Sequence, residues 1–280
     1  MMLQVARRTL VAALAMLAIA IPAVAQTDYR NLEAGRPLRV EDAYALERHA
    51  FEFALPVRSA SGGGVSSAAI APVLEYGVFR NAQISLALPF EQEDAGRSVW
   101  GTSGLSGGAL ANFFTESPRL PALSLHAGGT VPFGAFAGQA HGDVQALLTR
   151  SFGASRLHLN AAHRIGPDAT EGEVAPRWWY GAALDHTLYR SSLLLVLEAR
   201  AERAANSEPI SAVIGGGVRW QWTPTFVLSL GAARRLTDTG PDREITIGIT
   251  HVFAVPWLMP VRGRPMPERP TDASGGHRHD

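Results

Sequence analysis

The chain of 280 residues contains no cysteine, which excludes disulfide bonds and thiolate metal sites. Its formal net charge is zero, so it carries no electrostatic footprint for nucleic acid. Beyond the N-terminus, no run reaches the roughly 18 consecutive apolar residues that a membrane-spanning helix needs. A membrane protein without such a helix must be a closed β-barrel, because lipid offers no hydrogen-bond partner to unpaired backbone groups.

The N-terminal residues 1–25 have the features of a secretory signal peptide. Arg7 and Arg8 form the positive start, residues 10–21 the apolar core, and residues 23–25 the small-residue cleavage site. An uncleaved helical anchor is the alternative, which the shortness of the apolar run disfavours. Residues 26–47 are assigned as a periplasmic N-terminal segment. The sequence leaves open whether this segment lies under the barrel, lies inside its mouth, or simply leads into the first strand.

Residues 48–253 alternate between apolar and polar positions, and the last segment shows the pattern most clearly. Ile245, Ile247 and Ile249 share one face, whereas Glu244 and Thr246 lie on the other. A period of two indicates a β-strand. About twelve such segments follow one another, with a weak one at residues 107–116. The sequence therefore predicts an all-β fold, a transmembrane antiparallel up-and-down β-barrel of about 12 strands.

The connections between these segments separate a membrane barrel from a soluble sandwich, which alternation alone does not. Long connections are predicted at residues 58–67, 91–106, 134–141, 166–176, 202–209 and 235–243, and the connections between them are short. Short periplasmic turns and long exterior loops are typical of outer-membrane barrels.

Aromatic residues collect at the predicted strand ends, which indicates two interfacial belts. Beside the short turns lie Tyr76, Phe79, Phe152, Tyr189, Trp220, Trp222, Phe226 and Phe253, and beside the long loops lie Phe90, Phe133, Trp178 and Trp179. Ordinary core aromatics are the alternative interpretation.

The polar face of the segments supplies the candidate lumen-lining residues. They are Glu52, Glu75, Gln83, His126, His158, Asn160, Arg164, Asp185, Glu198, Arg200, Arg219 and Gln221. Four of them, Asp185, Glu198, Arg200 and Arg219, come from three consecutive strands, so we expect one cross-strand charge network. Such a network either rigidifies a narrow barrel or forms a constriction that orients solutes.

The C-terminal residues 254–280 are rich in proline and are predicted to be extended or disordered. His277, His279 and Asp280 are weak candidates for a metal site, and a solvated tail is the favoured interpretation.

Several loose motifs together resemble one known family, over residues 36–253. They include Arg36-Pro37, residues 75–77, residues 100–105, residues 121–125 leading to 131–134, His158-Leu159-Asn160 and the closing strand. The sequence is similar to the outer-membrane transporter family associated with the meta-cleavage pathway of phenol degradation. The resemblance implies an outer-membrane barrel for small hydrophobic or aromatic compounds, without catalytic residues. It also implies that the closing strand, which ends at Phe253, is read by the barrel-assembly machinery.

Three functions remain open at this stage. The first is a passive channel in the bacterial outer membrane, with lipid and a small-molecule solute as partners and no cofactor. The second is a closed structural or adhesive barrel. The third, a lipid-active enzyme, is disfavoured because His158 and Asn160 share the lumen face and no nucleophile is evident beside them.

Overall fold

The computed structural model describes residues 29–94, 98–166, 176–188, 192–204, 209–255 and 258. The predicted signal peptide and almost all of the C-terminal tail, with His277, His279 and Asp280, lie outside these residues. Among the described residues, the model contains no helix that is both long and apolar enough to cross a membrane.

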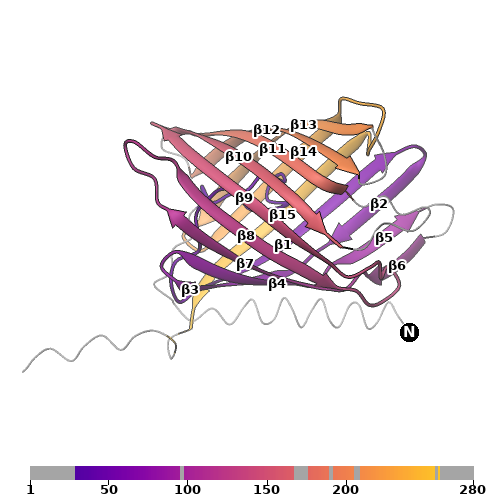
Figure 1. Cartoon of the computed structure of the whole chain (residues 1–280), viewed down its shortest axis with the longest axis horizontal. Coiled ribbons are helices and arrows are strands. Elements are labelled where there is room, and N and C mark those ends of the chain that lie inside the picture. The colour runs from indigo at the N-terminus through magenta and orange to yellow at the C-terminus, as the bar shows by residue number, and fades with distance from the viewer. Residues whose placement is uncertain are drawn as a thin grey trace, which may run out of the picture.

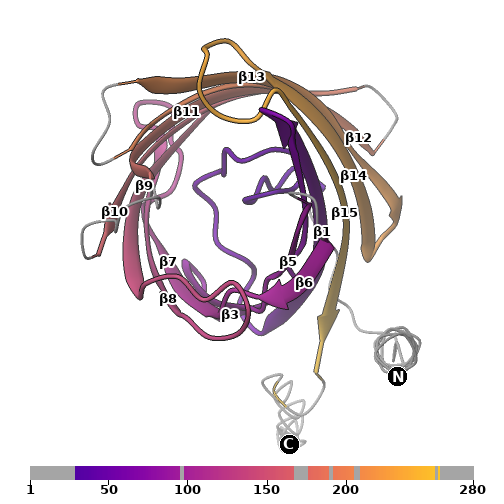
Figure 2. The same ribbon diagram turned by 90° about the vertical axis from the view of Figure 1, so that its right-hand side faces the viewer.

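Fifteen antiparallel strand segments form a single sheet that closes on itself (Figures 1 and 2). They are β1 (Ala50–Gly62), β2 (Val65–Ile70), β3 (Val73–Phe79), β4 (Ala82–Ala87), β5 (Phe90–Asp94), β6 (Ser98–Thr102), β7 (Leu105–Phe114), β8 (Ala122–Val131), β9 (His141–Phe152), β10 (Ser155–Ile165), β11 (Pro176–Thr187), β12 (Leu193–Ala204), β13 (Ile210–Thr223), β14 (Phe226–Arg235) and β15 (Arg243–Ala254). The pairing of β15 with β1, from Ala50↔Ala254 to Ser61↔Arg243, closes the barrel.

Three pairs of segments are single strands with a break in the middle. β2 and β3 both pair with β1 and are separated at Ala71-Pro72, and β4 and β5 are separated at Leu88-Pro89. Proline has no N–H to donate to the ladder, which explains both breaks. β6 and β7 are separated at Ser103-Gly104, where Gly104 has a φ of 145° that favours glycine. With each pair counted once, the fifteen segments make twelve strands, so the predicted twelve-stranded barrel is confirmed.

Two of the predicted long loops are wrong, because the chain there continues as strand. Residues 58–67 complete β1 and begin β2, and they turn at Gly63 and Gly64, whose φ values are 60° and 81°. Two consecutive residues with positive φ allow a tight hairpin, so backbone pairing does not have to end early. Residues 91–106 likewise form most of β5, all of β6 and the start of β7. These segments lengthen the wall at the long-loop end of the barrel (Figure 1).

The outer wall is apolar and the inner wall is polar. On β15, Ile245, Ile247 and Ile249 are 52%, 54% and 40% exposed, whereas Thr246 and Thr250, on the alternate positions, are buried. In a barrel, an exposed apolar stripe faces outward, and in a transmembrane barrel it faces lipid.

Most of the aromatic residues at strand ends also point outward. Phe79, Phe152 and Trp222 at the short turns are at least 60% exposed, and Trp178 at the other end is 45% exposed. Trp179 is a correction to the predicted belt, because alternation along β11 turns its side chain into the bore. Tyr189 lies outside the described residues.

Candidate functional site

The bore is occupied by the chain that precedes β1. Figure 2 shows this segment, residues 29–49, as an irregular trace inside the ring of strands. We call it the N-terminal plug. Of the three placements left open by the sequence, the structure therefore shows the one inside the barrel. Residues 29–47 of the N-terminal segment predicted at residues 26–47 lie in the bore (Figure 2).

Polar side chains of the wall satisfy the backbone of the plug, which forms no ladder with the strands. The N–H groups of Arg39 and Val40 both donate to Glu198 Oε2, each at 2.7 Å. Glu41 N–H donates to Asn160 Oδ1 at 2.7 Å, and Asn160 Nδ2 donates back to the Glu41 carbonyl at 2.9 Å. Buried backbone groups require such partners, so these wall residues determine the path of the plug.

The same arrangement continues along the plug toward β1. Ala43 N–H donates to Thr149 Oγ1 at 3.0 Å, and the Ala43 carbonyl accepts from Asn112 Nδ2 at 2.7 Å and from Ser124 Oγ at 2.5 Å. Leu46 N–H donates to Gln83 Oε1 at 2.5 Å. Asn112, Ser124 and Thr149 were not predicted as site residues. Their position on the polar face of a strand is the only sequence signal that could have identified them.

Apolar contacts hold the other side of the plug. Leu32, Leu38 and Val40 are buried against a group of wall residues that includes Leu194 and Val196. A buried leucine or valine side chain contributes about 1.5–3 kcal/mol relative to an exposed one. The plug is therefore a packed part of the protein.

Arg36 is the most buried cation of the plug, and it lies among three carboxylates. Its guanidinium donates to Glu52 of β1 and to Glu75 of β3, the latter at 3.2 Å, and pairs with Glu33 of the plug itself. Oxygens of the three carboxylates lie within 4.8 Å of one another, which would suit a metal ion. The guanidinium contacts all three carboxylates, so it already fills the position that a cation would take.

Arg219 of β13 holds the plug at the same level. It donates to the carbonyl of Arg36 at 2.8 Å and to that of Tyr29 at 3.0 Å. Arg200 of β12 instead donates to Glu198 at 2.9 Å and to Glu244 at 2.6 Å. Asp185 belongs to a third group, described next. Of the expected cross-strand network, the structure shows the Glu198–Arg200 pair, whereas Asp185 pairs with Arg156 and Arg219 donates to backbone carbonyls of the plug.

A hydroxyl, an imidazole and a carboxylate line up beneath the plug. His158 Nδ1 lies 2.9 Å from Thr149 Oγ1, and His158 Nε2 lies 3.0 Å from Asp185 Oδ2. This order resembles the relay of a hydrolase. The three residues are nevertheless fully buried, and the Thr149 hydroxyl accepts from the Ala43 N–H of the plug. The plug covers the hydroxyl, so substrate cannot approach it in this arrangement.

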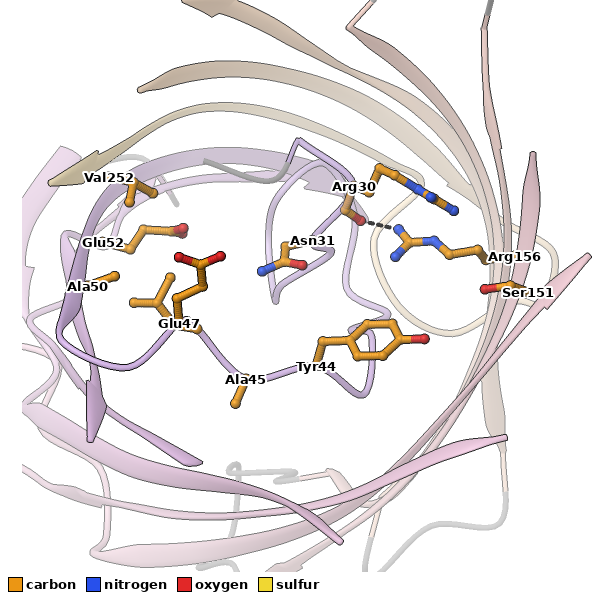
Figure 3. A pocket seen from close by; sticks show the side chains of 11 residues that line it. Arg30, Asn31, Tyr44, Ala45, Glu47, Ala50, Glu52, Ser151, Arg156 and Val252 are labelled. Carbon is orange, nitrogen blue, oxygen red and sulfur yellow. Dashed lines mark hydrogen bonds between the residues drawn. The ribbon is translucent and has the colours of Figure 1, made fainter. Parts of the chain in front are cut away.

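Arg156 completes this group and was missed by the sequence analysis. Its Nε donates to Asp185 Oδ2 at 2.9 Å, its Nη1 lies 3.6 Å from Asp42 of the plug, and it also donates to the Arg30 carbonyl (Figure 3). It shares a strand face with His158, which is the signal that could have identified it.

The pKa values of the plug reflect its enclosed position. Burial raises the pKa of Glu41 to about 8, and the charge of Glu75 adds to the effect. Burial also raises the pKa of Asp42, although Arg156 opposes the shift. Burial, followed by the hydrogen bond to Glu116, raises the pKa of Tyr44 to about 12. For Glu116 burial acts upward, but hydrogen bonds from Ser151 and Tyr44 outweigh it and lower the pKa.

Two cavities lined by described residues lie in the bore, toward opposite ends of the barrel. The turn-side cavity, about 340 Å³, is lined by Arg30, Tyr44, Glu47, Glu52 and Arg156 among others (Figure 3). The loop-side cavity is about 260 Å³. Its lining consists of Ala34, Arg39, Glu41, His126, Asp143, Gln145, Ala162, Arg164, Trp179 and Glu202. Plug residues line both cavities, so the plug lies between the two ends of the bore.

The remaining candidate residues also lie on the inner wall. Gln83 and Glu75 meet at 3.2 Å, and His126 lies 3.6 Å from Asp143 at the loop-side cavity. Gln221 is half-buried at the short-turn end and donates to the Pro224 carbonyl at 3.5 Å.

Comparisons with known proteins identify the fold. No family model matches the chain, and no curated protein matches it either. Among solved structures, it is similar to an outer membrane channel from Pseudomonas putida F1, with a TM-score of 0.58 and 16% identity, covering 79% of this chain and 100% of that one. The KdgM porin gives a TM-score of 0.49 and 6% identity over 72% and 98% of the two chains. LpxR from Salmonella typhimurium gives a TM-score of 0.44 and 10% identity, covering 71% of this chain and 99% of that one. The fold is that of a twelve-stranded outer-membrane β-barrel.

Proposed function

We propose that the protein is a bacterial outer-membrane channel for small solutes, and that the N-terminal plug limits passage through it. The observation that carries this proposal is the bore itself, which holds a polar, charged cavity on each side of the plug. A barrel of about eight strands leaves little interior space and one of 16–18 strands leaves an open channel, so twelve strands suit small molecules.

The apolar outer wall supports a position in the outer membrane, with lipid as its immediate partner. The fold shared with an outer membrane channel is consistent with this location. Assembly by the barrel-assembly machinery follows from the same proposal. Hydrophobic or aromatic solutes, and the link to phenol degradation, rest on the sequence resemblance alone and remain predictions.

A closed structural barrel is the second candidate, and the plug is the specific observation that favours it. The extensive contacts of the plug would suit a barrel that never opens. We favour the channel because an inert filler would leave no reason for charged cavities at both ends of the bore. The lipid-active enzyme is less consistent with the structure, since His158 is fully buried under the plug.

Liposome swelling tests the proposal, and an engineered disulfide tests the role of the plug. A Cβ atom built on Gly35 of the plug lies 3.5 Å from Pro56 Cβ of β1, which is within the range of disulfides. The chain has no other cysteine, so Gly35→Cys with Pro56→Cys forms a single defined bond. Gly35 has a φ of 80°, so the substitution costs about 1–2 kcal/mol.

We expect the oxidised double variant to swell liposomes more slowly than the reduced one, and reduction to restore the rate. The two single-cysteine variants are the controls and should not respond to reductant. The channel would be ruled out if liposomes with the natural protein and liposomes with the reduced variant both swelled at the rate of protein-free liposomes. Equal swelling by the oxidised and reduced forms would show that solutes pass without displacement of the plug.

A further inference from the structure

The loop-side cavity is lined by an arginine of the barrel wall. Arg164 of β10 lines this cavity, is half-buried, and makes no hydrogen bond or salt bridge to any residue in the described part of the chain. Its cross-strand neighbour is Asp143, whose carboxylate attracts the guanidinium but lies closer to His126, at 3.6 Å. A guanidinium carries five N–H donors in a planar fork, which matches a planar acceptor group that enters the cavity.

One of the three carboxylates around the cavity is held by other cations. Glu202 pairs with Arg39 and also lies 3.7 Å from Arg200 Nε, so one carboxylate serves two cations. Glu41 is the third acid, and its raised pKa of about 8 leaves it mainly protonated at neutral pH. Apart from Asp143, the cavity therefore offers a ligand mainly hydrogen-bond donors, and these are on cationic side chains.

The remaining lining is small and apolar. Ala34, Ala162 and the indole of Trp179 contribute the non-polar surface. A volume of about 260 Å³ is below the roughly 300–1,000 Å³ of cavities that enclose drug-sized ligands. The space suits one small molecule.

We propose that the loop-side cavity binds a small carboxylate-bearing solute, held by Arg164 of the wall and Arg39 of the plug. A carboxylate matches the guanidinium fork through two parallel charge-assisted hydrogen bonds. An apolar or aromatic body lies against Trp179 and the alanines. The bound solute bridges wall and plug, and it competes with Glu202 for Arg39. The inference rests on the proposed function and assigns the class of solute that enters the channel.

Calorimetric titration of the detergent-solubilised full chain with benzoate tests this inference. Benzyl alcohol and benzylammonium are matched neutral and cationic probes. We expect benzoate to bind more tightly than either, and Arg164→Gln to weaken benzoate binding by about tenfold or more. Arg203→Gln is the matched control. Arg203 is exposed on the outer face of β12, two strands from β10, and its replacement removes the same charge at a similar height. Equal binding of the three probes, or unchanged benzoate binding by Arg164→Gln, would overturn the inference.

Swelling measurements on the same samples separate this inference from the proposed function. If the liposomes admit neutral solutes but the protein shows no preference for benzoate, the binding site is overturned and the proposed channel is not. Selective benzoate binding without any swelling would support the site and contradict the channel.

Discussion

Replacing Arg36 by methionine should release the N-terminal plug. Arg36 is 2% exposed and contacts Glu33, Glu52 and Glu75. Methionine keeps much of the side-chain volume but leaves these carboxylates without their cation. Removing one partner of a buried ion pair costs about 3–5 kcal/mol. A loss of about 3 kcal/mol lowers the ratio of docked to undocked plug roughly 150-fold.

The effect should fall on the plug and spare the barrel, because the twelve strands hold each other through their own ladders. Hydrogen exchange followed by mass spectrometry should show lost protection in peptides that cover residues 29–49 and unchanged protection in β8 to β14. Conductance in planar bilayers should rise in the same variant.

The control is Arg48→Met, at an exposed arginine near the end of the same plug, for which no change is expected. A folded Arg36→Met variant with natural exchange protection over residues 29–49 and natural conductance would refute the claim that this ion cluster anchors the plug.

Two further predictions concern close approach and pH. A Cβ on Gly77 would lie 2.0 Å from the Glu47 carbonyl oxygen, so Gly77→Ala should destabilise the protein by about 1–3 kcal/mol and lower the temperature of the heat-induced gel shift. Gly107→Ala is the control, because a Cβ there has its nearest contact at 3.7 Å and should not change that temperature. Equal shifts in both would contradict the contact. Glu41 binds its proton more tightly in the docked plug, with a pKa of about 8 against an ordinary 4.5, so plug docking should weaken as pH rises from about 4.5 to 8 and level off above. Hydrogen exchange of the plug at several pH values, after correction for intrinsic exchange rates, should show this trend. Glu41→Gln should diminish it. A trend of opposite sign would refute the assignment to Glu41.

The strands and their faces were predictable because side chains alternate along a strand whatever its neighbours are. Ile245 and Ile247 point outward, and Glu244 and Thr246 point inward, as the period of two requires. The lengths of the loops were less predictable. Gly63 and Gly64 were assigned to a loop from composition, but the same residues make the tight turn that lets β1 and β2 continue.

The sequence by itself determined the barrel, its strand number and the side of each strand that meets the bore. Only the tertiary structure decided what fills that bore. The plug has no repeating pattern, and its backbone is satisfied by side chains remote in the sequence, such as Glu198 for Val40 and Thr149 for Ala43. Such contacts exist only after the sheet has closed, because closure brings polar residues of distant strands around one enclosed segment.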